Sequence, residues 1–152
     1  DKAFKRAEGL LENWMKEHHD KDCYPPTIIN ITDGEYNGTS YDEMQQLANQ
    51  LKSMFTNDGN VLLFNIHVVP EHAESVVFPA TADELNGNGY GKKLYEMSSL
   101  LPLNYNEQIR NIFGDKQADI RYHAMGVNTG MERLVKMMKI GTLSRMLANQ
   151  NP

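Results

Sequence analysis

The residues best suited to chemistry follow a buried strand near the start of the chain. Thr32-Asp33-Gly34-Glu35 places two carboxylates in a turn, and the run before it is Thr27-Ile28-Ile29-Asn30-Ile31. A short β-branched apolar run bounded by turn residues is typical of a parallel strand covered on both faces. Asp33 is therefore expected at the carboxyl end of that strand, where open α/β sheets bind ligands. Asp-Gly is also ordinary turn chemistry, so a purely structural role for Asp33 stays open.

Other motifs for catalysis are missing or badly placed. The glycine-rich run Asn86-Gly87-Asn88-Gly89-Tyr90-Gly91 follows no predicted strand, so we expect a flexible loop and no phosphate-binding function. The sequence contains no Gly-x-Ser-x-Gly elbow and no credible pair of nucleophile and base. His67 lies near the end of a second apolar run, where we expect a hydrogen-bonded structural histidine. The sequence therefore names no catalytic and no cofactor-binding residue.

The composition of the 152 residues excludes several kinds of partner. The net charge is −5, and no cluster of Lys or Arg is interleaved with aromatic residues, which argues against nucleic acid. The apolar runs are far shorter than the roughly 20 residues that span a bilayer, so we expect no membrane segment. The single cysteine, Cys23, cannot form an internal disulfide and fits a reducing compartment. We therefore expect a cytoplasmic location.

Hydrophobic periodicity predicts alternating helices and strands within a single α/β unit over residues 1–152. The predicted strands lie near 27–33, 61–69 and 122–128, and the predicted helices cover 3–17, 40–56 and 129–148. The pairs Ser40–Glu43 and Thr129–Glu132 have the spacing of capping boxes at the starts of the last two helices. Helices between strands make right-handed crossovers, so we expect a Rossmann-like parallel sheet flanked by helices. We expect residues 70–89 to form an accessory flap.

The first predicted strand is expected at an exposed edge, followed across the sheet by the second and the third. A strand as apolar as residues 27–32 normally lies in the middle of a sheet, yet it has one neighbour along the chain. An open edge of this kind invites association with another chain. We therefore expect its other neighbour to come from residues upstream of Asp1 or from another chain.

Three segments resemble von Willebrand factor type A domains. The fourth-strand motif of that family is similar to Pro25-Pro26-Thr27-Ile28-Ile29-Asn30-Ile31-Thr32-Asp33-Gly34-Glu35. The strand that follows it in the family is similar to Asn60-Val61-Leu62-Leu63-Phe64-Asn65-Ile66-His67. The close of the last helix in soluble bacterial members resembles Lys139-Ile140-Gly141-Thr142.

This resemblance implies a doubly wound sheet of six strands, with this chain as its C-terminal half and the N-terminal half missing. It also implies a Mg²⁺ or Mn²⁺ ion above the sheet, with Asp33 as one metal ligand. The family's other ligands, an Asp-x-Ser-x-Ser motif and a threonine, have no counterpart here. Because Mg²⁺ prefers six octahedral oxygens, we do not expect this chain alone to bind it tightly.

Two classes of function follow. The resemblance favours a metal-dependent protein-binding module with a scaffold or regulatory role and no catalysis of its own. An acidic residue of the protein partner would complete the coordination of the metal. The alternative is a metal-dependent nucleotide-using or hydrolytic α/β enzyme with Asp33 as a metal carboxylate. The lack of a glycine-rich phosphate loop argues against the enzyme.

Overall fold

The computed structural model of the chain describes residues 2–18, 22–34, 40–68, 74–86 and 88–142. Its helices are α1 (Lys2–His18), α2 (Tyr41–Ser53), α3 (Gly89–Met97), α4 (Asn106–Phe113) and α5 (Met131–Gly141). Its strands are β1 (Thr27–Thr32), β2 (Phe55–Thr56), β3 (Gly59–Asn60), β4 (Leu62–Val68), β5 (Val76–Val77) and β6 (Met125–Thr129). Two 3₁₀ helices are η1 (Ala82–Leu85) and η2 (Leu103–Tyr105).

Four strands form the central sheet, in the order β1-β4-β6-β5. β1, β4 and β6 are parallel, which confirms the three predicted strands, their direction and their order from the edge strand β1. β5 pairs antiparallel with β6 at the opposite edge, and the sequence does not predict it. The predicted count of three strands in the sheet is therefore corrected to four. The described part of the expected flap contains β5 and η1.

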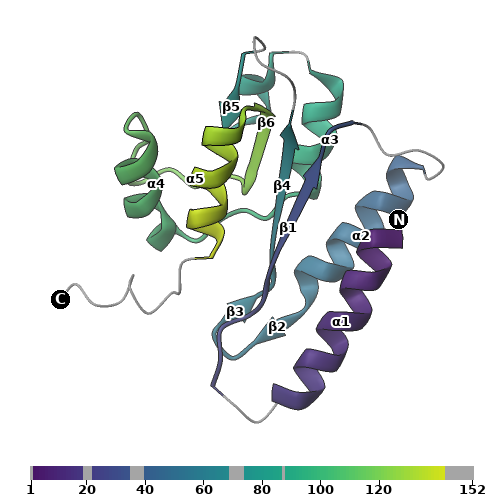
Figure 1. Cartoon of the computed structure of the whole chain (residues 1–152). Coiled ribbons are helices and arrows are strands. Elements are labelled where there is room, and N and C mark those ends of the chain that lie inside the picture. The colour runs from purple at the N-terminus through teal and green to yellow at the C-terminus, as the bar shows by residue number, and fades with distance from the viewer. Residues whose placement is uncertain (1, 19–21, 35–39, 69–73, 87, 143–152) are drawn as a thin grey trace.

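Helices cover both faces of this sheet, so the fold is a three-layered, Rossmann-like α/β arrangement (Figure 1). Alternate residues of the β4 region point to opposite layers. Val61 and Leu63 pack in the core beneath α1, α2 and α3, whereas Leu62, Phe64 and Ile66 pack beneath α4 and α5. All five side chains are at most 5 % exposed. Burial on both faces explains why this segment is apolar nearly throughout.

Two predicted helices are shorter than their patterns suggest. α2 ends at Ser53, and the chain then forms the hairpin of β2 and β3, where the sequence predicts helix as far as residue 56. Gly59 has a φ of 131°, which suits a glycine in this tight turn. α5 ends at Gly141, and the last predicted helical residues, 143–148, lie outside the described part of the chain.

One predicted capping box is present and the other is not. Ser40 accepts a hydrogen bond from the Glu43 backbone N–H, and the Glu43 carboxylate accepts one from the Ser40 backbone N–H. Thr129 does not cap α5, because Gly130 occupies the position before the helix and makes no side-chain cap. The Thr129 hydroxyl instead donates to the His67 carbonyl at 2.8 Å. Thr129 therefore makes a tertiary hydrogen bond to β4 in place of the predicted local cap of α5.

Candidate binding site at the carboxyl ends of the strands

Asp33 lies where the sequence predicts it, in the turn at the carboxyl end of β1. Thr32 makes the hydrogen bonds that hold this turn: its hydroxyl donates to the Gly34 carbonyl at 2.5 Å and accepts from the Gly34 N–H at 3.3 Å. The Asp33 side chain is exposed and makes no hydrogen bond or ion pair with the residues that the structure describes. Its carboxylate is therefore available to a ligand, and the turn does not depend on it.

The turn is fixed to the neighbouring strands and to α3. In the sheet register Thr32 lies opposite His67, at the end of β4. The Tyr90 hydroxyl donates to the Gly34 carbonyl at 2.9 Å, and the Tyr90 ring meets the His67 ring edge to face, with centroids 5.1 Å apart. These contacts fix the turn that carries Asp33 to β4 and α3.

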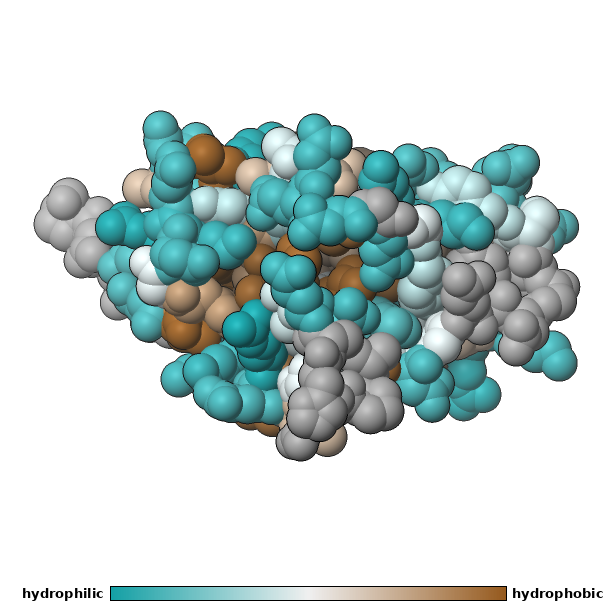
Figure 2. All heavy atoms as spheres, turned by 90° about the horizontal axis from the view of Figure 1, so that it is seen from above, coloured by the Kyte–Doolittle hydropathy of each residue, from teal (hydrophilic) through white to brown (hydrophobic). Residues whose placement is uncertain are grey.

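Figure 2 looks onto this end of the molecule and shows hydrophobic residues at the centre of the face, with hydrophilic residues around them.

His67 is not the hydrogen-bonded histidine that the sequence suggests. Its buried Nδ1 atom has no hydrogen-bond partner among the described residues. Packing against Tyr90 orients the ring instead. Because Nδ1 is shielded from solvent, it does not add a second ligand atom beside the Asp33 carboxylate.

A buried chain of polar side chains lies below this edge, and the sequence does not predict it. The Asn30 amide donates to the Asn65 side-chain oxygen at 2.9 Å, and the Asn65 amide donates to the Ser98 hydroxyl at 3.0 Å. Asn65 is fully buried, so these bonds offset the cost of removing its amide from water. They join β1, β4 and the end of α3. The sign of this network in the sequence is an asparagine within each of two apolar segments, Asn30 and Asn65, which lie opposite each other in the sheet register.

The described residues do not by themselves form a metal centre. No group of three or more His, Cys, Asp or Glu side chains in the described ranges could hold a metal ion. Glu35, the second carboxylate of the turn, lies outside those ranges. Asp33 can supply one oxygen ligand, whereas Mg²⁺ needs about six. A tight metal site that includes Asp33 would therefore need further ligands, from water or from groups outside these acidic, histidine and cysteine side chains.

The fold and this edge define a protein of the Rossmann-like α/β class. Comparison with protein-family models, with curated proteins and with solved structures finds no match for this chain. Among the helices described, none has the length and apolar character needed to cross a membrane.

At the opposite end of the sheet, just before β6, His123 has a strongly lowered pKa. Burial, followed by the charges of Lys52 and Arg121, lowers the pKa of His123 from 6.5 to about 4. Its Nδ1 atom is buried without a partner in the described structure, and its ring lies 3.7 Å from the Tyr95 ring. The folded protein therefore keeps His123 neutral at a pH where the unfolded chain would protonate it.

We expect this histidine to make folding less favourable as the pH falls. Between pH 6.5 and about 4 the unfolded state binds more protons, so the free energy of unfolding decreases. Because the ring is only half-buried, we expect a loss of about 1 kcal/mol between pH 7 and pH 5. Urea unfolding at both values checks this. His123→Phe should lose less stability over that interval than the wild type, and equal losses would contradict the assignment.

Proposed function

We propose that this chain is part of a metal-dependent protein-binding module with a scaffold or regulatory role and no catalysis of its own. The observation that carries the proposal is the exposed carboxylate of Asp33, which bonds to none of the described residues and lies at the carboxyl end of the edge strand of the described sheet. Open α/β sheets bind ligands at this position. The proposal includes a cytoplasmic location, where Cys23 would stay reduced.

The outer edge of β1 is the second feature that supports this proposal. The Pro26 carbonyl accepts a hydrogen bond from the Leu62 N–H at 3.4 Å, so it points towards β4. Because backbone groups alternate along a strand, the N–H and C=O groups of Thr27, Ile29 and Ile31 point away from β4. No described strand lies on that side. Ile31 is also 46 % exposed. A strand from another segment or another chain would satisfy these groups.

That added strand would also bring metal ligands close to Asp33. If it runs parallel to β1, its carboxyl end meets the same edge of the sheet as Asp33 does. Mg²⁺ or Mn²⁺ would then be bound by oxygen ligands from both sides, with an acidic residue of the protein partner completing the coordination. The bound ion supplies a positive charge that a carboxylate of the partner recognises.

Magnesium titration of the isolated chain tests whether the site is incomplete. We expect weak or undetectable heat in titration calorimetry, because one carboxylate cannot satisfy the coordination of Mg²⁺. Tight binding of one Mg²⁺ per chain would contradict the proposal, since the chain would then hold a complete metal site of its own.

A further inference from the structure

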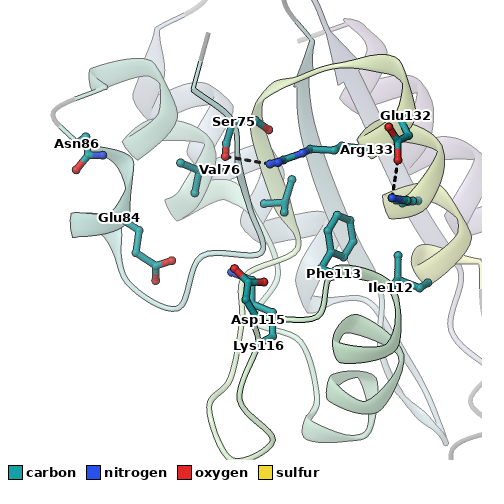
Figure 3. Close-up of a pocket in the computed structure, with 12 residues that line it drawn as sticks. Ser75, Val76, Glu84, Asn86, Ile112, Phe113, Asp115, Lys116, Glu132 and Arg133 are labelled. Atoms are coloured by element: carbon teal, nitrogen blue, oxygen red, sulfur yellow. Dashed lines mark hydrogen bonds and ion pairs between the residues drawn. The ribbon is translucent and has the colours of Figure 1, made fainter. Parts of the chain in front are cut away.

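A pocket of about 560 Å³ lies between α4, α5 and the edge strand β5 (Figure 3). This volume falls in the range of small-molecule sites, roughly 300–1,000 Å³. Apolar side chains of β5 and α4 line it, namely Val76, Val77, Ile112 and Phe113, whereas α5 contributes charged side chains. Neither Asp33 nor His67 is among its lining residues, so it is separate from the edge site.

Among the described residues, two cationic side chains at this pocket form hydrogen bonds only with neutral carbonyl groups. The Lys116 ammonium donates to the Phe78 carbonyl at 3.1 Å, and the Arg133 guanidinium donates to the Ser75 carbonyl at 3.2 Å. Neither forms an ion pair with the residues that the structure describes. Acidic residues outnumber basic ones in this chain, which has a net charge of −5. Two cations without an ion-pair partner among the described residues are therefore unusual. Arg133 keeps most of its five N–H donors for a ligand.

The acidic side chains of the pocket differ in whether their carboxylates are still available to bind a ligand. Glu84 accepts two backbone N–H groups at 2.7 and 3.0 Å, and Glu132 is paired with Lys136 at 2.6 Å. Asp115 is exposed, and its carboxylate makes no hydrogen bond or ion pair with the described residues, although its backbone N–H donates to the Phe113 carbonyl at 3.0 Å. The Ser75 hydroxyl, which also lines the pocket, is buried without a hydrogen-bond partner in the described structure. A buried polar atom of this kind is often satisfied by a ligand or water.

We propose that this pocket binds a small zwitterion with an apolar body, which is the chemistry of a free apolar α-amino acid. The planar guanidinium of Arg133 binds the carboxylate, Asp115 binds the ammonium group, and Phe113 contacts the apolar side chain. The charges of the lining residues favour a neutral ligand over phosphate, since three cations face three anions: Lys116, Arg133 and Lys136 against Glu84, Asp115 and Glu132.

Titration of the whole chain with L-leucine tests this proposal, using calorimetry or NMR chemical shifts. We expect saturable binding with a dissociation constant of about 1 mM or lower. N-acetyl-L-leucine lacks the ammonium group and L-leucinamide lacks the carboxylate, so each should bind at least about tenfold more weakly. Absence of saturable L-leucine binding would overturn the proposal. Inorganic phosphate binding as tightly as L-leucine would also overturn it, because the pocket would then select anions.

Matched variants assign the two charged ends of the ligand. Arg133→Gln and Asp115→Asn should each weaken L-leucine binding at least about tenfold. Lys139→Gln removes an exposed charge from the same helix, outside the pocket lining, and should leave binding unchanged. Arg133→Lys keeps the charge without the planar fork and should bind with intermediate affinity. Unchanged affinity in Asp115→Asn, with a melting temperature equal to that of the wild type, would contradict a zwitterion site.

Discussion

Replacing Phe64 by alanine is expected to lower the free energy of unfolding by about 3–5 kcal/mol. Phe64 is fully buried in the middle of β4, and its ring meets the Phe78 ring edge to face, with centroids 6.3 Å apart. A Cβ atom at Gly141 would lie 3.4 Å from the Phe64 ring, so α5 packs closely over this side chain. Truncation therefore leaves a cavity between the sheet and α5, and close packing prevents its collapse.

Thermal or urea unfolding measures this effect, and Phe64→Leu provides the control. The alanine variant should melt about 10 °C lower, since each 1 kcal/mol shifts the melting temperature of a chain this long by about 2–4 °C. Phe64→Leu keeps most of the volume and should cost less than about 1.5 kcal/mol. A loss of under about 1 kcal/mol for Phe64→Ala would mean that α5 does not pack on β4 in this way.

Replacing Asp33 by alanine is expected to remove the weak Mn²⁺ binding proposed for this edge and to leave stability nearly unchanged. The carboxylate is exposed and unbonded in the described structure, so its loss should change the free energy of unfolding by under about 0.5 kcal/mol. Thr32 holds the turn, and Thr32→Val should therefore cost about 1 kcal/mol. Metal affinity should fall because, in the proposed function, the exposed Asp33 carboxylate supplies a hard-oxygen ligand at the end of β1.

Asp119→Ala serves as the control, because Asp119 is also exposed and lies in a loop far along the chain. It should change neither stability nor Mn²⁺ affinity. If Asp33→Ala instead lowered stability by about 1 kcal/mol with unchanged metal affinity, Asp33 would be a structural turn residue.

Patterning along the sequence was enough to predict the three parallel strands of the sheet, because β1, β4 and β6 each belong to an apolar or well-bounded segment and helices occur between β1 and β4 and between β4 and β6. β5 was not predictable in this way. It consists of Val76 and Val77 alone, and its pairing with Gly126 and Val127 depends on a partner some 50 residues away. The hairpin of β2 and β3 had a local signal, Asp58-Gly59, but helical periodicity through Phe55 outweighed it.

The candidate sites differ in how far the sequence could reveal them. Asp33 was predictable because an Asp-Gly pair directly follows a buried strand, and the carboxyl end of such a strand is a known place for ligands. The bond from Tyr90 to Gly34 joins positions 56 residues apart, and no local pattern encodes it. The pocket beside β5 was not predictable, because Asp115 and Arg133 come together only after two helices pack on one face of the sheet.

The most direct test of a metal role for Asp33 is the broadening of backbone amide signals by Mn²⁺ in NMR spectra of the isolated chain. A weakly bound paramagnetic ion still broadens the signals nearest to it, so an incomplete site can be located. We expect Asp33 and Gly34 to broaden first, followed by His67 in the neighbouring strand, and we expect Asp33→Asn to abolish the effect. Broadening that begins elsewhere, or that persists unchanged in Asp33→Asn, would contradict a metal-binding role for Asp33.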